Sequence, residues 1–316
     1  MKVLVTRPLT DRATAAIRAA CDATFRDTNT PLTADQAAQA MRDHDAIIPT
    51  LGDAFTAEGF RGDLRCRLLA NFGAGFNHID VAAARAAGVA VTNTPDVVTD
   101  ATADIALTLM LMTLRRASEG ERILRAGEWT GWNPTQLLGA EMTGRTVGIV
   151  GMGRIGQAIA RRCHHGFGME VVFFNRSTVT GLDHPARQIA RLGDMLAACD
   201  VAVVAVPGGA ETRGLIGADE LRALGPRGVL VNIARGDVVD EEALIAALTT
   251  GTIAGAGLDV YAREPHVPQA LLAAPNATLL PHLGTATDDT RTRMGLRALA
   301  NLQAFIDGTD LPDAVG

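Results

Sequence analysis

The chain has 316 residues, of which 47% are hydrophobic and 20% are charged, and its formal net charge at pH 7 is −6. This length allows two domains with cores of their own, and the composition is that of a folded protein rather than a disordered one. The negative charge gives no electrostatic reason to expect nucleic acid or an anionic membrane surface as a partner.

Two further features bear on the compartment. The longest apolar tract, residues 105–114, is about half the length of a membrane-spanning helix, and the apolar run at residues 3–5 is too short for a signal peptide. The four cysteines lie far apart, without the spacing of metal ligands: Cys21, Cys66, Cys163 and Cys199. They indicate packed thiols in a reducing compartment. We therefore expect a cytoplasmic protein with no membrane segment and no metal site.

Short apolar runs alternate with amphipathic segments over the first ninety-odd residues. The predicted strands are residues 3–5, 46–48, 68–70 and 89–92. The predicted helices are residues 11–20, 33–42 and 80–87, the second with Thr33 as its N-cap. This alternation predicts a small α/β unit with a parallel sheet. Gly73 and Gly75 follow a strand, but His78 stands where a third glycine would complete a nucleotide fingerprint, so they indicate a turn or a site for a small anion.

The pattern breaks at Thr94, Pro95 and Asp96, which mark the first domain boundary. Residues 101–126 then predict one long helix, apolar nearly all round in its first half and polar in its second. A helix that is apolar on every face must be buried on every face, between domains or between subunits. We therefore predict a homodimer with this helix at its interface.

A strand, a glycine turn, a helix and a second strand follow in residues 145–177. The turn reads Gly151-Met152-Gly153-Arg154-Ile155-Gly156. In such a unit the first glycine permits a tight turn, the second lets a pyrophosphate approach the backbone, and the third lets the helix pack closely on the strand. The N–H groups at the helix N-terminus can then bind the phosphates. The pattern predicts a dinucleotide-binding βαβ unit.

The end of the second strand indicates which dinucleotide is preferred. A chain that selects NAD usually has Asp or Glu here, for the ribose 2′-hydroxyl. This chain has Asn175, Arg176 and Ser177, which offer a guanidinium and a hydroxyl to a 2′-phosphate. The alternative is that Arg176 is a solvated turn residue. We predict a preference for NADP(H), with NAD(H) also possible.

Strands and helices continue to alternate after this unit. Strands are predicted at residues 201–206, 229–233, 254–258 and 278–280, and helices at about 194–198, 218–224, 241–249 and 288–306. The nearly continuous apolar strands predict a doubly wound sheet covered on both faces, in which ligands bind beyond the carboxyl ends of the strands. Polar residues that follow successive strands are Arg235, Asp259, Glu264 and His282. Arg, Glu and His at neighbouring strand ends could converge beside a nicotinamide.

At these residues the chain resembles the D-isomer-specific 2-hydroxyacid dehydrogenases, over nearly its whole length. Four segments carry the resemblance: residues 71–80, the glycine fingerprint, the stretch around Arg235, and the Glu264/His282 pair. Within the family, residues 94–100 and 127–132 are most similar to the glyoxylate/hydroxypyruvate reductases. The resemblance implies two doubly wound α/β domains. One is a flavodoxin-like substrate domain of residues 1–97 and 286–316, and the other is a Rossmann-type NAD(P)-binding domain of residues 98–285.

The resemblance also implies roles for individual residues. Arg235 would bind the substrate carboxylate and polarise the 2-oxo group, His282 would donate a proton to its oxygen, and Glu264 would orient His282 and favour its protonated form. The implied substrate contacts are Leu51, Gly52, Ala74, Gly75, Arg235, His282 and Thr285. The implied cofactor contacts are Gly151, Gly153, Arg154, Ile155, Gly156, Asn175, Arg176, Ser177, Val206, Pro207, Thr212, Ile233, Ala234, Arg235, Asp259, His282 and Gly284. Asp259 would hold the nicotinamide amide. Trp132 would either reach the site of a neighbouring subunit or pack as a surface aromatic.

We therefore predict an NADPH-preferring 2-oxoacid reductase, most similar to a glyoxylate/hydroxypyruvate reductase. A different substrate (pyruvate, a keto-sugar acid or a bulkier 2-oxo acid) stays open, because pocket volume cannot be read from a sequence. Glu264 argues against a formate dehydrogenase, and the end of the chain at Gly316 without a regulatory domain argues against a phosphoglycerate dehydrogenase. The alternative from another class is a nucleotide-sensing binding protein or corepressor of the same fold, although the partner-binding extensions of such proteins are not apparent.

Overall fold

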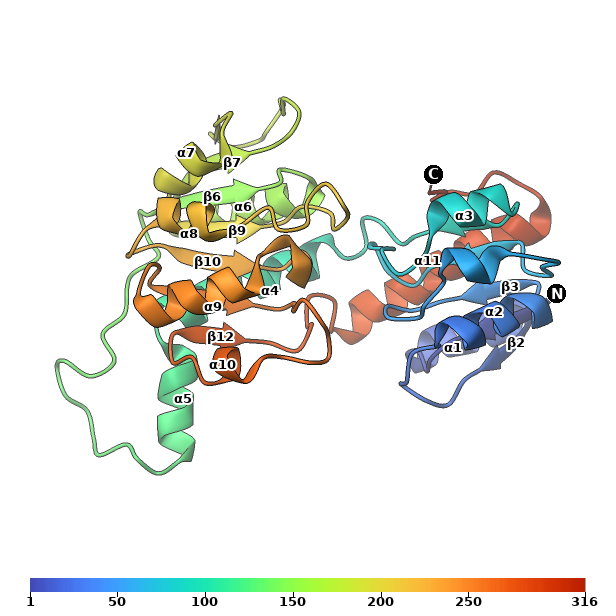
Figure 1. Cartoon of the computed structure of the whole chain (residues 1–316), viewed down its shortest axis with the longest axis horizontal. Coiled ribbons are helices and arrows are strands. Elements are labelled where there is room, and N and C mark those ends of the chain that lie inside the picture. Colours follow the sequence, from blue (N-terminus) through green and yellow to red (C-terminus); the bar gives the residue numbers. More distant parts are fainter. Residues whose placement is uncertain (316) are drawn as a thin grey trace. The chain divides into compact units, whose positions relative to one another are not determined.

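A computed structural model of the chain describes residues 1–315 and divides into two α/β units (Figure 1). Unit 1 consists of Met1–Val98 with the segment from Thr285 onward, and unit 2 consists of Thr99–Gly284. Each boundary lies one residue from the position expected from the sequence. Both units are built on parallel sheets, as predicted.

Unit 1 has a five-stranded sheet in the order β2-β1-β3-β4-β5, the flavodoxin-like order. Its strands are β1 (Lys2–Val5), β2 (Asp22–Phe25), β3 (Ala46–Ile48), β4 (Leu68–Ala70) and β5 (Ala90–Thr92). Its helices are α1 (Asp11–Ala20), α2 (Ala34–Asp43), the 3-10 turn η1 (Ala57–Phe60), α3 (Val81–Ala86) and α11 (Asp288–Asp307). Thr33 caps α2 as expected, by accepting a hydrogen bond from the Gln36 N–H.

Successive side chains of the unit 1 strands point to opposite faces of the sheet, so each strand contributes to two cores. Val3 and Val5 pack with Ile17 of α1 and Leu302 of α11, whereas Leu4 packs on the other face with Met41 of α2. The last helix of the chain therefore completes the core of unit 1. This packing explains why residues near both ends of the sequence belong to one unit.

Unit 2 has a seven-stranded parallel sheet in the order β12-β11-β10-β9-β6-β7-β8. Its strands are β6 (Thr146–Val150), β7 (Glu170–Phe174), β8 (Arg187–Gln188), β9 (Val201–Val204), β10 (Val229–Asn232), β11 (Gly255–Leu258) and β12 (Ala277–Leu279). Its helices are α4 (Thr99–Leu114), α5 (Ala117–Arg125), α6 (Arg154–Phe167), α7 (Leu192–Ala197), α8 (Ala218–Leu224), the 3-10 turn η2 (Gly236–Val238), α9 (Glu241–Thr250) and α10 (Gln269–Leu272). Strand order reverses between β6 and β9, which is the point where dinucleotides bind in doubly wound sheets.

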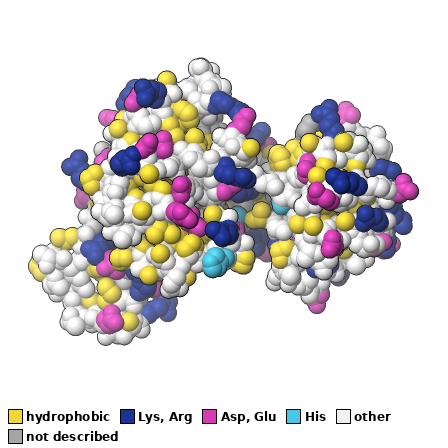
Figure 2. Space-filling view, viewed as in Figure 1, with side chains coloured by type: hydrophobic (Ala, Val, Ile, Leu, Met, Phe, Trp, Pro, Cys, Tyr) yellow, Lys and Arg dark blue, Asp and Glu magenta, His cyan; other side chains and the backbone are white. Residues whose placement is uncertain are grey.

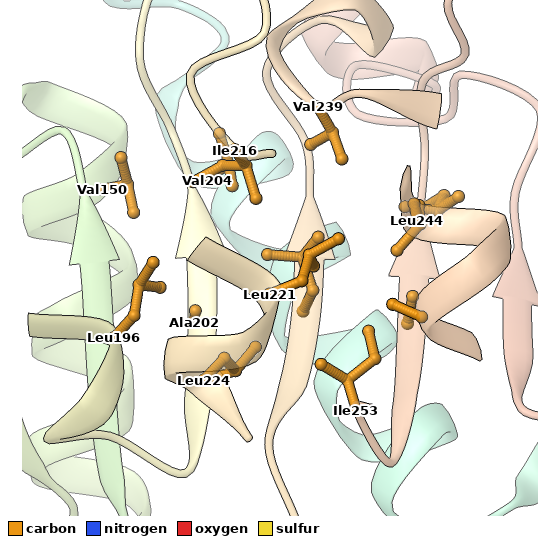
Figure 3. Packing of buried hydrophobic residues seen from close by; sticks show 14 of the residues in the cluster. Val150, Leu196, Ala202, Val204, Ile216, Leu221, Leu224, Val239, Leu244 and Ile253 are labelled. Carbon is orange, nitrogen blue, oxygen red and sulfur yellow. The ribbon is translucent and has the colours of Figure 1, made fainter. Parts of the chain in front are cut away.

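Both faces of this sheet are buried, as the continuous apolar strands predicted. Figure 3 shows one face, where Leu196 of α7, Leu221 of α8 and Leu244 of α9 lie over the strands. On the other face, α4 and α6 cover residues such as Ile149 and Val203. The sheet is thus a rigid base for the loops at its carboxyl edge.

The single helix predicted over residues 101–126 is wrong, because the structure has two helices there, α4 and α5. Arg116, which separates them, has a left-handed backbone with φ 51°. The returning chain explains the break: the Ala140 N–H donates to the Leu114 carbonyl oxygen at 2.8 Å, and a side chain at Gly139 would overlap that oxygen. Continued helix would need the same carbonyl as its own acceptor.

Unit 2 itself covers much of the apolar surface of α4. Leu109 and Met110 are fully buried, and α4 packs on α6 and on strands β10, β11 and β12. Ile105, Leu111 and Met112 are only partly buried, so a dimer interface on α4 stays a prediction. Exposed apolar side chains occur on α5 and the segment after it, namely Leu124, Trp129, Trp132 and Leu138.

Cys66, Cys163 and Cys199 are buried free thiols and Cys21 is partly buried, so the cysteines do pack as expected. Burial raises the pKa of Cys163 to about 12, which leaves that thiol protonated and unreactive. Within residues 1–315, no helix combines the length and the apolar character that crossing a membrane requires. On the face of the molecule in Figure 2, positive and negative side chains are interspersed.

Candidate active site

The glycine turn after β6 has the geometry that its sequence predicts. Gly151 has φ +99°, a conformation that L side chains rarely adopt, and a Cβ there would lie 2.8 Å from the Val206 side chain. A Cβ at Gly156 would overlap the Gly151 carbonyl oxygen, so only glycine lets α6 begin this close to the strand. By contrast, a Cβ at Gly153 would meet nothing within 4 Å. The first and third glycines serve packing, and the second faces open space.

That open space lies at the N-terminus of α6, whose first residues are Arg154 and Ile155. Gly153 is the N-cap and supplies no side-chain acceptor for the first turn. The dipole of the helix favours an anion at this end. The chain therefore fits the pyrophosphate of a dinucleotide at this turn.

The side chain of Asn175, which follows β7, is hydrogen-bonded both to the glycine turn and to Ser177. Its Oδ1 accepts a hydrogen bond from the Met152 N–H at 3.2 Å, and its Nδ2 donates to the carbonyl oxygen and Oγ of Ser177. Arg176 between them is 85% exposed, and its Nη1 forms an ion pair with the Glu211 carboxylate. This partner, thirty-five residues along the chain, could not be expected from the sequence of the strand end.

Glu211 lies on the loop after β9, in which Val206, Pro207 and Thr212 were expected to contact the cofactor. The Thr212 Oγ1 donates to the Pro207 carbonyl oxygen at 2.7 Å, which closes the loop on itself. Together with the Val206 contact at Gly151, this places the loop beside the glycine turn.

Arg235 follows β10 and is preceded by two buried residues, Ile233 and Ala234. Asn232 shapes this turn, since its Nδ2 donates to the Arg235 carbonyl oxygen at 2.9 Å and its Oδ1 accepts from the Ala234 N–H. In the guanidinium, Nη1 donates to the Ala234 carbonyl oxygen, but the buried Nε has no partner within the described residues. Burial lowers the pKa of Arg235, and the carboxylates of Glu264 and Asp237 oppose this effect. A partly buried, charged and incompletely bonded guanidinium is suited to an anionic ligand.

Glu264 and His282 form the pair that the sequence predicted. His282 Nδ1 lies 2.8 Å from Glu264 Oε2, and Glu264 Oε1 accepts from the Tyr261 N–H at 3.0 Å. Burial alone would raise the pKa of Glu264, but the hydrogen bond and charge of His282, the Tyr261 N–H and the Arg235 guanidinium together lower it. Because the carboxylate accepts at Nδ1, that nitrogen carries the proton and Nε2 is directed elsewhere.

A buried aspartate holds the turn that carries His282. Asp259 accepts from the backbone N–H groups of Leu283 at 2.6 Å and Gly284 at 2.8 Å. His282 itself has φ +54°, a left-handed conformation that is uncommon for a residue with a side chain and is often found at functional sites. Burial raises the pKa of Asp259, and the two backbone donors oppose this effect. The contacts give Asp259 a positioning role that the sequence did not indicate.

Two further residues that the sequence did not single out bring the Arg235 and Glu264 loops together. A Cβ at Gly236 would overlap the peptide between Tyr261 and Ala262, so the loops touch through their backbones. The Tyr261 hydroxyl donates to the Leu280 carbonyl oxygen at 2.9 Å, just before His282. The roles of Gly236 and Tyr261 can be recognised only from the three-dimensional approach of the two loops.

In unit 1, the Gly73–Gly75 turn has its carbonyl groups drawn inward. Asn71 Nδ2 donates to the carbonyl oxygens of Gly73 and Gly75, both at 3.0 Å, and Asn93 Nδ2 donates to that of Ala74 at 2.8 Å. Within the described residues, no hydrogen bond is donated by the backbone N–H groups of Ala74 and Gly75. Such a turn can present N–H groups to a small anion. Asn93 had not been recognised from the sequence.

The neighbouring turn of unit 1 contains Leu51 and Gly52. Leu51 is exposed, and Gly52 has φ +93°. The turn is fixed by Asp53, whose buried carboxylate accepts from the Thr50 N–H at 2.8 Å and from the Leu32 N–H at 2.8 Å. Thr285 is the first residue of unit 1 after the second boundary, next to Gly284 of unit 2 in the sequence.

The site residues thus form separate groups within the units. Unit 2 holds two of these groups. The first consists of the glycine turn, the end of β7 and the loop after β9, and the second consists of Arg235, Glu264, Asp259 and His282. Unit 1 holds the turns of Leu51–Gly52 and Ala74–Gly75.

Comparisons with known proteins show the family of the chain. The family described as "D-isomer specific 2-hydroxyacid dehydrogenase, NAD binding domain" matches residues 107–284. A glyoxylate reductase from Thermococcus kodakarensis is 44% identical over 280 residues, which cover 87% of this chain and 84% of that protein.

Two solved structures have the same fold. A Polaromonas protein assigned to the same family has 36% identity and a TM-score of 0.92, and the match covers 100% of this chain and 99% of that one. An NADPH-dependent glyoxylate/hydroxypyruvate reductase from Sinorhizobium meliloti, in complex with NADP and malonate, has 39% identity and a TM-score of 0.87, with 100% and 96% covered. This chain belongs to the D-isomer-specific 2-hydroxyacid dehydrogenases, and it is an NAD(P)-dependent oxidoreductase of 2-hydroxy acids.

Proposed function

We propose that this enzyme is a glyoxylate/hydroxypyruvate reductase that prefers NADPH and uses His282 as its proton donor. The observation that carries the proposal is the 2.8 Å contact between His282 and Glu264, beside the incompletely bonded Arg235. The similarity to glyoxylate reductases supports the substrate class. When bound, the nicotinamide cofactor supplies the hydride.

His282 provides the proton that the substrate oxygen needs. Its Nδ1 is engaged by Glu264, so Nε2 is the nitrogen that can donate to a ligand. The lowered pKa of Glu264 keeps its carboxylate charged at neutral pH, so a negative charge lies beside Nδ1 of His282. A proton can therefore move from Nε2 to the 2-oxo oxygen during reduction.

Arg235 and the unit 1 turn are proposed to bind the 2-oxo acid. The planar guanidinium can donate two parallel hydrogen bonds to a carboxylate, a geometry that an ammonium cannot reproduce. The N–H groups of Ala74 and Gly75 are suited to the same kind of anion, with Leu51 and Gly52 lining the turn. Thr285 stays a predicted substrate contact.

The preference for NADPH rests on the strand end after β7. Arg176 is highly exposed and can donate charge-assisted hydrogen bonds to a 2′-phosphate, and Ser177 can add a hydroxyl. Position 175 has the uncharged amide of Asn, which does not repel that phosphate as a carboxylate would. NADH remains a possible cofactor, with Asp259 and the β9 loop as predicted contacts for either dinucleotide.

A homodimer remains part of the proposal, with α5 and the segment after it added to the surface expected on α4. This region extends from the sheet of unit 2 in Figure 1, and Figure 2 shows hydrophobic side chains at its surface. Leu124 is 60% exposed and Trp132 is 79% exposed, which favours burial in an assembly.

Light scattering at micromolar concentration should give the mass of a dimer, and Leu124→Glu should lower the measured mass. The control is Leu272→Glu on α10, because Leu272 is similarly exposed. A monomeric wild type would refute the dimer and any action of Trp132 in a neighbouring subunit.

One assay panel tests the activity. We expect glyoxylate and hydroxypyruvate to give the highest kcat/KM among 2-oxo acids, with NADPH preferred to NADH. A higher kcat/KM for pyruvate, a keto-sugar acid or a bulkier acid would assign the enzyme to that substrate instead. Absence of turnover with every acid would favour a nucleotide-sensing binding protein. The cytoplasmic location stays a prediction, which imaging of a tagged copy would test.

A further inference from the structure

The arginine proposed to bind the 2′-phosphate already has an acidic partner. Arg176 Nη1 donates to Glu211 Oε2, and the two side chains are 85% and 78% exposed. Ion pairs this exposed contribute little to folding stability. The position of the pair, beside the place for the adenine ribose, gives it another consequence.

The backbones on both sides of the pair are held by local contacts. Next to Arg176, the Asn175 side chain bonds Met152 N–H and Ser177. Next to Glu211, the Thr212 N–H and Oγ1 donate to Gly209 and Pro207. The two side chains, rather than the loops, are therefore the parts that can rearrange when a ligand arrives.

We propose that Glu211 is a specificity-determining residue that competes with the 2′-phosphate for Arg176 and so limits the preference for NADPH over NADH. This inference rests on the proposed function, in which Arg176 binds that phosphate. Binding of NADPH requires the guanidinium to exchange the Glu211 carboxylate for the phosphate, or to share its donors between two anions. NADH has a hydroxyl at this position and leaves the ion pair intact.

The size of the effect follows from charge and screening. The 2′-phosphate must overcome the attraction between Arg176 and Glu211, which is weak in water-like surroundings and which salt reduces further. Loss of the competing carboxylate should therefore tighten binding of the 2′-phosphorylated ligand by about three- to tenfold. Binding of the ligand without this phosphate should be unchanged.

Calorimetry with two cofactor fragments tests the competition without turnover. The probes are adenosine 2′,5′-bisphosphate and adenosine 5′-monophosphate, which differ only in the 2′-phosphate. Glu211→Gln should bind the bisphosphate about three- to tenfold more tightly and the monophosphate as before. The gain should vanish in the Arg176→Ala background. Asp219→Asn, which breaks a similarly exposed ion pair on α8, should change neither affinity.

The outcomes separate this inference from the proposed function. If Arg176→Ala binds the bisphosphate as tightly as the wild type does, Arg176 does not bind the phosphate and both ideas are overturned. If Arg176→Ala weakens binding but Glu211→Gln does not tighten it, only the competition is overturned. A gain from Glu211→Gln that persists without Arg176 would also overturn the competition, because Glu211 would then act on the phosphate directly.

Discussion

Replacement of Glu264 by Gln removes one negative charge beside His282 and conserves the shape of the side chain. The amide oxygen of Gln can still accept from Nδ1 of His282, which lies 2.8 Å from the carboxylate in the wild type. The amide nitrogen then takes the place of Oε1, which accepts from the Tyr261 N–H at 3.0 Å in the wild type, so that hydrogen bond is lost. The variant therefore separates the charge of Glu264 from its role in orienting the imidazole.

The expected effect can be worked out from the geometry. Opposite unit charges about 4 Å apart attract by about 1 kcal/mol in water and about 4 kcal/mol at an effective dielectric constant of about 20. The His282 and Glu264 side chains are 30% and 31% exposed, which places the pair between these limits, at about 1.5–2.5 kcal/mol. At about 1.4 kcal/mol for each factor of ten, the loss of this attraction should lower kcat/KM by about ten- to sixtyfold.

The assay is kcat/KM for glyoxylate reduction at saturating NADPH. The control is Glu241→Gln, because the Glu241 carboxylate accepts from the Ala262 N–H of the same loop at 3.3 Å but does not contact His282. The wild type and the control should have the same kcat/KM. An unchanged kcat/KM in Glu264→Gln, or an equal loss in the control, would refute the pairing as a support for proton donation by His282.

Three other predictions follow from the contacts described above. Arg235→Ala should lower kcat/KM by about a hundredfold or more at unchanged cofactor affinity in a fluorescence titration, with poor rescue by Lys; near-normal activity would contradict its assignment. Gly153→Ala should weaken NADPH binding and leave Tm unchanged, whereas Gly156→Ala should lower Tm by several degrees. Equal changes of Tm in the two variants would contradict the different surroundings of the two glycines. Burial would raise the pKa of Asp313, but hydrogen bonds from Arg297 and Asn301 outweigh burial and lower this pKa. The Asp313 carboxylate therefore stabilises the fold at pH values above its unfolded-state pKa. This stabilisation is lost as the pH falls through the folded-state pKa. Asp313→Asn should therefore lower Tm at about pH 7 by more than at about pH 3, and a pH-independent difference would refute this linkage.

Local sequence was sufficient to predict most of the architecture. The runs at residues 46–48, 68–70 and 218–224 coincide with β3, β4 and α8, because their periodicity and flanking residues agree with their burial. Strand β2 was not predicted, since its sequence Asp-Ala-Thr-Phe is short and has only two apolar residues. Strand β8 has only two residues, too few for any periodicity.

The remaining differences depend on contacts between distant residues. The break after α4 comes from the Ala140 N–H, which no feature of residues 101–126 could indicate. The partner of Arg176 lies on another loop, and the support of the Ala74 turn comes from Asn93. In contrast, the pairing of Glu264 with His282 was predictable, because both follow neighbouring parallel strands whose carboxyl ends meet at one edge.

The backbone contact at Gly236 has a consequence for how substrate binding energy is used. Since the turn after Arg235 touches the Tyr261–Ala262 peptide, and Tyr261 is bonded to both Glu264 and the Leu280 carbonyl, the three proposed catalytic side chains belong to one folded body. Their ordering entropy is lost when unit 2 folds, before any 2-oxo acid arrives. Attraction between the enzyme and its substrate is then free to act on the reacting geometry instead of assembling the catalytic group.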